Sequence, residues 1–333
     1  MRLGIIGSGA IVQEFLPELA VMNGLEILAI QGTKNNQDTV NGLCEQYQIP
    51  HAVFSFEELC KTEIDTVYVA VPNFLHFEYC KKALENGYHV IVEKPVTSNL
   101  KEAKILKKLS EEKGRFLFEA VTTAYLGNYR KIQEWLPRIG EIKIAQSQYS
   151  QYSSRYDAFL EGKVLPAFDP AKSGGALMDL NLYNLHYIMG LFGKPCDAVY
   201  TANIERGIDT SGVAVLKYPS FTAVCMAAKD CKGLAGGVIQ GTRGCIRSLA
   251  SPNFVGEVRL ELNDGTVEVY DDHGAEKRLL PEFHAFIKAI HGKDRDFCQM
   301  MLEKSLAVSE VQTKMRLEAG IRFPADEENV CLQ

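Results

Sequence analysis

The sequence predicts two domains, an α/β domain followed by a β-rich domain that also contains helices. At 333 residues the chain exceeds the length at which a single hydrophobic core stops growing. Apolar strand patterns alternate with amphipathic helix patterns as far as Val121, whereas short β-rich segments separated by turn residues predominate from Cys196 onward. We therefore expect domains at residues 1–121 and 122–333.

The composition favours a protein that acts on small molecules. Lys and Arg together number 36 against 42 for Asp and Glu, and the net charge of -6 argues against broad contacts with nucleic acid. The chain opens directly on a strand pattern and has no apolar stretch of membrane-spanning length, so we expect a cytoplasmic protein. The nine Cys include no Cys-x-x-Cys pair or Cys/His cluster, and we expect no metal site.

The first strand, residues 3–6, leads through a glycine turn into a helix pattern. The Gly7-x-Gly9 spacing permits a tight turn and lets the backbone approach a pyrophosphate, which the helix N-terminus then stabilises. Val12 stands where a third small residue is usual, and this limits how closely the helix approaches the strand. We expect a dinucleotide to contact the turn residues Gly7, Ser8, Gly9, Ala10 and Ile11.

The loop after the second strand, residues 26–30, indicates which dinucleotide is bound. NAD sites usually have a carboxylate here for the ribose hydroxyls, whereas NADP sites lack it and supply a cation for the 2′-phosphate. This loop contains Gly32, Thr33 and Lys34 and no acid. Lys34 could also be an ordinary turn lysine, but the missing acid alone favours NADP over NAD.

Two further strand ends place polar residues at the same edge of the predicted parallel sheet. The strand at residues 66–71 ends at Val71 and is followed by Pro72, Asn73 and His76, and the strand at residues 90–92 is followed by Glu93-Lys94-Pro95. Ligands of doubly wound sheets bind at the carboxyl ends of the strands. Glu93 and Lys94 are therefore candidates for a cofactor site, although a solvated charge pair would also explain them.

These motifs together resemble the oxidoreductases grouped with glucose-fructose oxidoreductase, inositol 2-dehydrogenase and MocA. The resemblance rests on Gly7-x-Gly9, Ala70-Val71-Pro72-Asn73 with His76, Gly87-Tyr88-His89-Val90 and Glu93-Lys94-Pro95. It implies a Rossmann dinucleotide-binding domain and an α+β domain with a large open, mostly antiparallel sheet. It also implies a cis peptide bond at Pro95 and a homodimer or larger homo-oligomer formed through the C-terminal sheet.

The second domain is predicted to contain an antiparallel meander. The expected strands are residues 142–149, 198–204, 212–218, 222–228, 237–241, 245–250, 257–262 and 266–270. Turn residues such as Asn263-Asp264-Gly265 separate them. Helix patterns at residues 129–136, 282–290 and 300–319 accompany this sheet.

A polar stripe precedes most of these strands. Asp179, Tyr183 and His186 are spaced i, i+4 and i+7 after a glycine pair, so they share one face of a helix. The residues alone leave open whether this is a reactive site or a satisfied polar cluster in the core. Relatives have an Asp followed four residues later by His or Tyr, and Asp179 and Tyr183 match that pattern. Asn181 replaces the glycine that is usual between them.

The resemblance implies reversible hydride transfer between NADP, or NAD, and a secondary alcohol or carbonyl of a sugar, polyol or related compound. In this hypothesis Lys94 stabilises the reacting oxygen, Tyr183 exchanges its proton and Asp179 orients Lys94 or a substrate hydroxyl. Candidate substrate-binding residues are Tyr125, Arg155, Tyr156, Lys172 and His186. Structural roles explain the first four equally well.

Two other functions remain open. Some relatives hydrolyse glycosides through transient oxidation by a bound nicotinamide, with no net redox change. A non-catalytic dinucleotide-binding regulator is the second alternative, but such a module would need neither Lys94 nor Tyr183.

Overall fold

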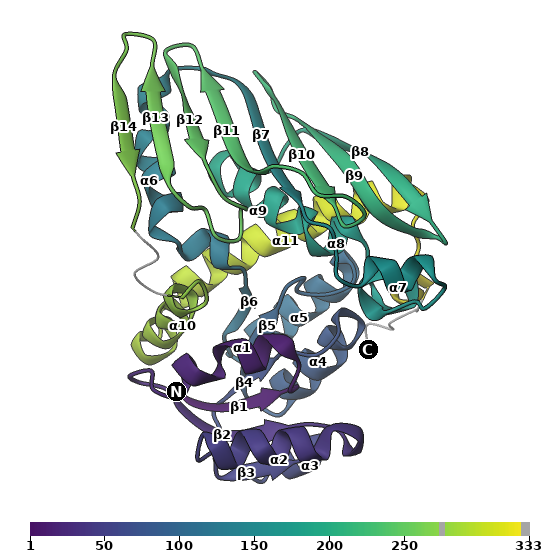
Figure 1. The fold of residues 1–333 in the computed structure, drawn as a ribbon. Helices are drawn as coiled ribbons and strands as arrows, with labels where there is room; N and C mark the ends of the chain where they lie inside the picture. The colour runs from purple at the N-terminus through teal and green to yellow at the C-terminus, as the bar shows by residue number, and fades with distance from the viewer. Residues whose placement is uncertain (273–276, 328–333) are drawn as a thin grey trace. The chain divides into compact units, whose positions relative to one another are not determined.

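The structure of the protein is a computed structural model that describes residues 1–272 and 277–327 (Figure 1). The chain forms two compact units. Met1–Ala120 and Glu282–Glu303 make up the first, and Val121–Pro281 with the chain from Lys304 onward makes up the second. Residues 282–303, which the sequence division assigned to the second domain, thus lie in the first unit. No helix in the described ranges is long and apolar enough to cross a bilayer.

The first unit contains a parallel six-stranded sheet in the order β3-β2-β1-β4-β5-β6. Its strands are β1 (Arg2–Ile6), β2 (Glu26–Gln31), β3 (His51–Val53), β4 (Thr66–Val69), β5 (His89–Glu93) and β6 (Leu117–Ala120). Its helices include α1 (Ala10–Leu19), α2 (Gln37–Gln46), α3 (Phe56–Leu59), α4 (His76–Glu85), α5 (Leu100–Glu112) and α10 (Leu280–Gly292). β4 and β6 are buried along their full length because helices cover both faces of the sheet. The predicted α/β fold is confirmed.

Aromatic packing explains why α10 belongs to this unit. The ring of Phe283 meets that of Tyr68 edge-on at 5.3 Å between centroids, and Phe286 stacks on Phe118 at 4.8 Å. Phe283 and Phe286 are both fully buried. The local helix pattern at residues 282–290 indicated an amphipathic helix but could not show which sheet its apolar face covers.

The second unit contains an eight-stranded sheet in the order β14-β13-β12-β11-β7-β10-β9-β8. The strands are β7 (Ile142–Ser150), β8 (Asp197–Glu205), β9 (Ile208–Lys217), β10 (Thr222–Ala228), β11 (Ala235–Gly241), β12 (Gly244–Ser248), β13 (Val258–Leu262) and β14 (Val267–Tyr270). β10 pairs with β7 in parallel, and the other neighbours are antiparallel. The sheet is therefore mixed but mostly antiparallel, because the parallel pair of β7 and β10 joins two antiparallel groups. The expected large, mostly antiparallel sheet is confirmed, although the strands do not form one continuous antiparallel meander.

The two faces of this sheet differ in what covers them. Helices α6 (Gly127–Trp135) and α9 (Asn181–Phe192) lie along one face (Figure 1). Paired residues across seven strands are buried on that side: Ala198, Leu216, Ala223, Ala145, Ile239, Ile246 and Leu260.

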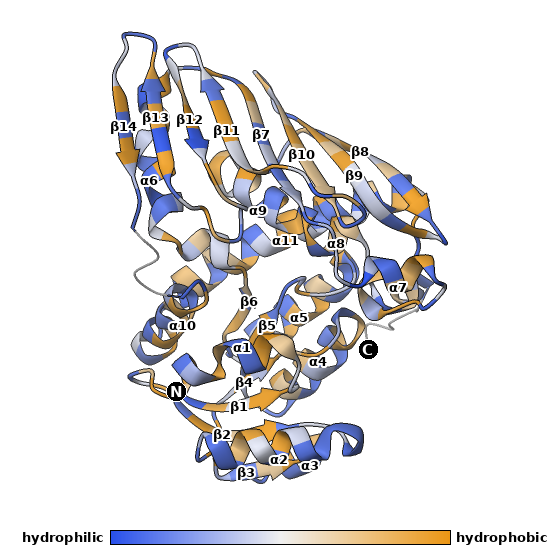
Figure 2. Ribbon diagram, in the orientation of Figure 1, coloured by the Kyte–Doolittle hydropathy of each residue, from blue (hydrophilic) through white to orange (hydrophobic). Residues whose placement is uncertain are grey.

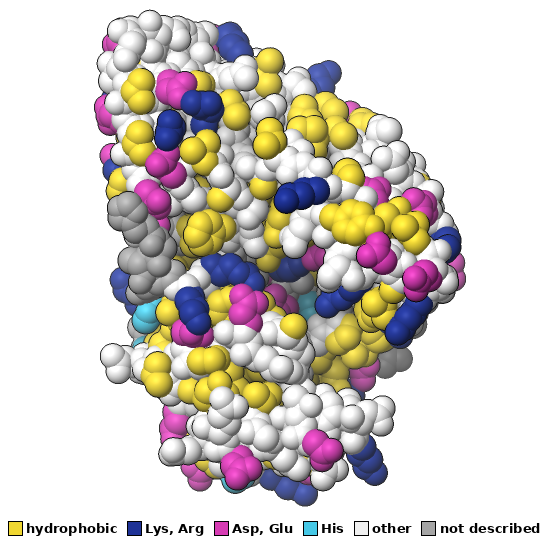
Figure 3. All heavy atoms as spheres, in the orientation of Figure 1, with side chains coloured by type: hydrophobic (Ala, Val, Ile, Leu, Met, Phe, Trp, Pro, Cys, Tyr) yellow, Lys and Arg dark blue, Asp and Glu magenta, His cyan; other side chains and the backbone are white. Residues whose placement is uncertain are grey.

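The opposite face presents apolar side chains to solvent. Val199 and Val215 are cross-strand partners on β8 and β9 and are 55% and 41% exposed. Apolar residues recur along β8, β9 and β10 in Figure 2, and Figure 3 shows hydrophobic side chains on the visible face of the sheet. An exposed apolar surface of this kind is typical of a protein–protein interface.

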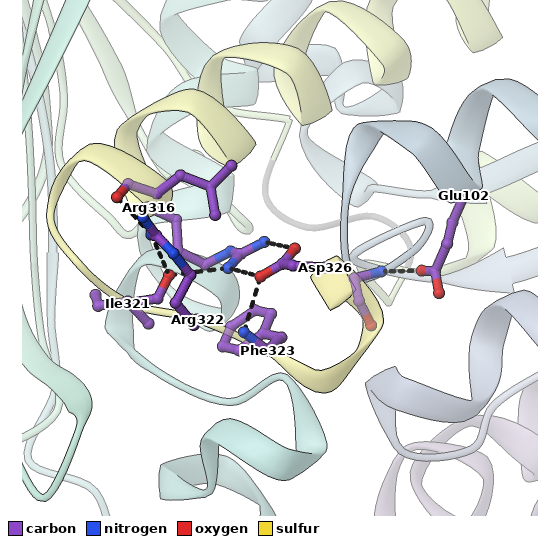
Figure 4. Close-up of polar contacts among 8 residues, drawn as sticks. Glu102, Arg316, Ile321, Arg322, Phe323 and Asp326 are labelled. Carbon is purple, nitrogen blue, oxygen red and sulfur yellow. Dashed lines mark hydrogen bonds and ion pairs between the residues drawn. The ribbon is translucent and has the colours of Figure 1, made fainter. Parts of the chain in front are cut away.

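The end of the described chain is held by an almost fully buried ion pair (Figure 4). Arg316 of α11 (Arg295–Glu318) has a side chain that is 1% exposed and forms two bonds of 2.7 Å to the carboxylate of Asp326. Its guanidinium also donates to the carbonyl of Ile321 and lies 3.9 Å from the ring centroid of Phe323. Asp326 belongs to α12 (Pro324–Glu327), so this contact docks the last described turn.

Replacing Asp326 with asparagine is expected to destabilise the second unit by about 3–5 kcal/mol, because the guanidinium stays buried without a compensating charge. Glu327→Gln, one residue further along at an exposed position, is the matched control and should leave stability unchanged. The measurement is the urea midpoint of the far-ultraviolet circular dichroism signal. Equal midpoints for the two variants would contradict a stabilising role for the pair.

Candidate active site

The glycine turn after β1 has the shape that a dinucleotide phosphate requires. Gly7 has a φ of 116°, and a Cβ there would lie 2.2 Å from the carbonyl oxygen of Ala70, so only glycine fits. Gly9 is the N-cap of α1, with no side chain capping that helix, and a Cβ built on it meets no atom within 4 Å. The helix N-terminus is thus open to an anion, and these residues fit the pyrophosphate of a dinucleotide.

The loop after β2 is fixed by a residue that the sequence analysis did not single out. Asn36 accepts a hydrogen bond of 2.6 Å from the backbone N–H of Thr33 and donates one of 2.7 Å to the hydroxyl of Ser8. It therefore joins the loop that contains exposed Lys34 to the glycine turn. A Cβ on Gly32 would lie 2.7 Å from the side-chain oxygen of Asn36, which explains the glycine there. The Thr-x-x-Asn spacing, a capping-box pattern, was the available signal.

The segment that contains Lys94 is anchored by buried contacts on either side of the lysine. Glu93 is 9% exposed and accepts a hydrogen bond from the hydroxyl of Tyr68 on β4. The backbone N–H of Val96 donates to the carboxylate of Glu119 at 2.8 Å. The Lys94–Pro95 peptide bond is cis, as the resemblance implied. Lys94 itself is half-buried at the carboxyl end of β5, so a rigid support presents its ammonium group.

His76 connects the ends of β4 and β5. Its side chain is fully buried, with Nδ1 2.7 Å from the carbonyl oxygen of Pro95 and Nε2 2.9 Å from that of Val71. Burial lowers the pKa of His76, while the contacts with the two carbonyl oxygens act in the opposite direction. The structure therefore places His76 under the loops that follow the two strands, where its ring supports them. Pro72 is exposed and Asn73 half-buried at the start of the next turn.

In the second unit, Asp179 and Tyr183 lie on two successive helices rather than one. α8 (Ala176–Asp179) ends at Asp179, and α9 begins at Asn181 after Leu180. The interruption coincides with the side chain of Asn181, which hydrogen-bonds the carbonyl of Cys225 and, through its oxygen, Asn184. Asn side chains compete in this way with helical backbone bonds.

Asn181 also explains how α9 is attached to the sheet. Asn184 donates to the carbonyl of Met226 at 2.9 Å and accepts from the hydroxyl of Ser147 at 2.7 Å. Asn181, Asn184 and Ser147 are fully buried. The residue that replaces the usual glycine therefore points into the sheet. Tyr183, 6% exposed, packs beside Tyr149 of β7 with 6.2 Å between ring centroids.

A buried carboxylate explains the second glycine of the pair before α8. Asp209 of β9 accepts a hydrogen bond of 2.6 Å from the backbone N–H of Leu177 and one of 2.7 Å from the hydroxyl of Tyr200. A Cβ on Gly175, whose φ is 103°, would lie 2.1 Å from a carboxylate oxygen of Asp209. Burial raises the pKa of Asp209 to about 6.

The most informative residue that the sequence analysis missed is Lys229, directly after β10. Its ammonium lies 2.8 Å from the carboxylate of Asp179, and its side chain is 3% exposed. The available signal was a lysine that follows a buried apolar strand.

The predicted substrate residues occupy different surroundings in the second unit. The hydroxyl of Tyr156 on α7 (Tyr156–Leu160) donates to Glu205 at 2.9 Å, and its ring stacks on Phe159. Arg155 is exposed, Lys172 and His186 are half-buried, and Tyr125 is 5% exposed. Tyr156 thus has a structural role in fixing α7.

A doubly wound parallel sheet with a glycine turn shaped for a pyrophosphate defines a dinucleotide-binding protein. Residues 1–121 match the oxidoreductase family with an NAD-binding Rossmann fold called GFO_IDH_MocA, and residues 129–247 match the GFO/IDH/MocA C-terminal domain. The chain belongs to the Gfo/Idh/MocA family of NAD(P)-dependent dehydrogenases and reductases.

Two curated relatives match almost the whole chain. The scyllo-inositol 2-dehydrogenase (NADP(+)) IolU of Bacillus subtilis is 30% identical over 331 residues, which covers 98% of this chain and 99% of the relative. The trans-1,2-dihydrobenzene-1,2-diol dehydrogenase of Mus musculus is 24% identical, with coverage of 98% and 99%.

Solved structures share the fold over the same length. The 3-ketoreductase KijD10 from Actinomadura kijaniata, in complex with NADP and TDP-benzene, superposes with a TM-score of 0.83 at 23% identity and covers 97% of this chain and 98% of its own. Levoglucosan dehydrogenase, in complex with NADH and levoglucosan, has a TM-score of 0.78 at 16% identity, with coverage of 96% and 97%.

Proposed function

We propose that the protein oxidises a secondary alcohol of an inositol, sugar or related polyol with NADP, or reduces the corresponding ketone. The observation that carries this proposal is the anchored loop that presents Lys94 at the carboxyl edge of the first sheet, beside the ends of β4 and β6. The scyllo-inositol dehydrogenase that matches 98% of the chain supports the substrate class.

Each candidate residue has a distinct part in this reaction. When bound, NADP supplies the hydride acceptor. Lys94 stabilises the negative charge that develops on the substrate oxygen, and Tyr183 takes the hydroxyl proton in oxidation and returns it in reduction. Asp179 accepts a hydrogen bond from a substrate hydroxyl and so orients the ring.

The remaining predicted residues support binding. In this proposal the backbone of the glycine turn and of the loops after β2, β4 and β5 holds the dinucleotide. Glu93 and His76 act through those loops, because their side chains are buried against Tyr68 and against two backbone carbonyls. His186, Tyr125, Arg155 and Lys172 remain candidates for contacts with the substrate.

Preference for NADP rests on the loop after β2. The strand ends in Gln31 and is followed by Gly32, Thr33 and exposed Lys34, with no carboxylate to bind the ribose hydroxyls. The curated relative from Bacillus subtilis is named for the same cofactor.

Replacing Lys34 with alanine is expected to raise the KM for NADP about 5- to 10-fold, as loss of one charge-assisted contact to a phosphate would. The KM for NAD should not change, because NAD lacks the 2′-phosphate. Steady-state kinetics with each cofactor measures both values. Lys108→Ala removes an exposed lysine of α5 and serves as the control. An equal change for the two cofactors would refute the role of Lys34.

We also propose that the outward face of the second sheet joins two copies of this chain. The face is apolar at Val199, Val213 and Val215, and the same patch on a second copy would cover it around a twofold axis. Val215→Glu should convert the dimer to a monomer in sedimentation equilibrium, because the buried charges would face each other. Val21→Glu changes an exposed valine of the first unit and is the control. A monomeric native protein would contradict the proposal.

The experiment that tests the function is a dehydrogenase screen. Inositol isomers, sugars and other polyols are each incubated with NADP and with NAD, and reduced nicotinamide is followed by absorbance. We expect turnover with at least one cyclic polyol and a higher kcat/KM with NADP. Release of sugar from an aryl glycoside without net cofactor reduction would favour a glycoside hydrolase instead. Cofactor binding without turnover would favour a regulator.

A further inference from the structure

Lys229 is a buried cation whose ammonium group contacts a carboxylate, a carbonyl oxygen and an aromatic ring. It follows β10 in the second unit, and its ammonium donates to Asp179 and to the carbonyl oxygen of Ala167, both at 2.8 Å. It also lies 4.7 Å from the centroid of the Phe168 ring, which is fully buried. An ammonium group with only 3% of its side chain exposed is held here by one carboxylate, one carbonyl and one aromatic face.

The two partners of this ion pair differ in exposure. Lys229 is 3% exposed, whereas 32% of the Asp179 side chain is exposed. Removing an ammonium from water costs several kcal/mol, and a buried pair is often no more stable than apolar residues of the same size. Stability alone therefore gives little reason for a lysine at this place. A function for the partially exposed carboxylate of Asp179 would explain why a lysine is buried beside it.

The backbone around the pair limits how Asp179 can move. α8 contacts both β9 and β10. At its start, the N–H of Leu177 is held by buried Asp209 of β9, and at its end Asp179 is held by Lys229, which follows β10. Both ends of this one-turn helix are thus fixed to neighbouring strands of one sheet. The carboxylate Oδ2 is fixed by the ammonium, while the side chain still reaches the surface.

We propose that Lys229 is a positioning residue that holds the carboxylate of Asp179 oriented toward the substrate. This inference rests on the proposed function, in which Asp179 accepts a hydrogen bond from a substrate hydroxyl. Lys229 itself touches neither substrate nor cofactor in this arrangement. Its effect on the reaction passes through Asp179 alone.

A double-mutant cycle tests this dependence. Lys229→Met keeps the length of the aliphatic stem and removes the charge, and Asp179→Asn keeps an oxygen acceptor without the charge. We expect Lys229→Met to lower kcat/KM for the polyol about 10- to 100-fold, whereas in the Asp179→Asn background the same change should alter it less than about threefold. The dissociation constant of NADPH, measured by its fluorescence, should stay within about twofold in every variant because that site belongs to the first unit.

The matched control is Lys314→Met, which removes a lysine from an exposed ion pair with Asp197 in the same unit and should leave kcat/KM unchanged. If Lys229→Met does not fold, Lys229→Gln retains a donor for the Ala167 carbonyl and replaces it in the cycle. Equal losses in both backgrounds, or no loss from either Lys229 variant, would overturn the proposal.

The cycle also separates this inference from the proposed function. Full activity of Asp179→Asn would refute the role of Asp179 itself, and the inference with it. Low activity of Asp179→Asn together with full activity of Lys229→Met would refute only the inference. If no polyol is turned over, the cycle is measured on the thermal midpoint of the second unit, where a coupling of zero would show that Lys229 does not hold Asp179.

Discussion

Replacing Lys94 with alanine is expected to lower kcat about 10²- to 10³-fold, the effect typical of losing a group that stabilises a developing oxyanion. The loop should keep its fold, because three contacts hold it. The Tyr68 hydroxyl donates to Glu93, the carbonyl oxygen of Pro95 contacts the His76 ring, and the backbone N–H of Val96 donates to Glu119. None of these contacts uses the lysine side chain. Steady-state kinetics with the best polyol from the screen measures kcat.

The control for Lys94 is Lys81→Ala, which removes a half-buried lysine of α4 paired with Glu85. It should leave kcat unchanged. Circular dichroism and the NADPH dissociation constant show whether each variant is folded and binds cofactor. A kcat for Lys94→Ala within about fivefold of the native value, with cofactor bound, would exclude electrostatic stabilisation by Lys94.

The second large effect is expected for Tyr183→Phe, which should lower kcat about 10²-fold because only the proton-carrying hydroxyl is removed. The ring remains packed beside Tyr149, so the thermal midpoint should not fall. Kinetics and thermal unfolding of the same preparation test both statements.

Tyr187→Phe is the control, and it is expected to lower stability without lowering kcat. Tyr187 is fully buried one turn further along α9, and its hydroxyl lies 3.2 Å from that of Ser248. Loss of the Tyr187 hydroxyl should lower the free energy of unfolding by about 1 kcal/mol and leave kcat unchanged. A fall in kcat of similar size in both variants would mean that Tyr183 acts through packing alone.

Local sequence patterns were sufficient for five strands of the first sheet, for the glycine turn and for the loop that contains Lys94. The turn at Gly7 and the segment at Lys94 each follow directly on a strand. In both, the glycine backbone or the lysine charge indicates the chemistry, so neighbouring residues in the chain were enough to predict the site. Short elements with weak patterns were missed. β3 and α3 have only three and four residues and show no clear period.

Long-range pairing could not be predicted in the same way. Nothing local to β7 and β10 shows that they pair in parallel, because that register joins residues 78 positions apart in the chain, such as Ile144 and Thr222. Lys229 was missed for the same reason. Its partner Asp179 is 50 residues earlier, and only the folded second unit brings the two side chains together.

In the proposed reaction, hydride leaves a polyol carbon with the help of Lys94. Its most direct test follows deuterium from the carbinol carbons of the best polyol into the reduced cofactor by mass spectrometry. The native protein should give one deuterium per reduced nicotinamide, and Lys94→Ala should form this product at least about 100-fold more slowly. Reduced cofactor without deuterium, or equal rates for the two proteins, would contradict the claim.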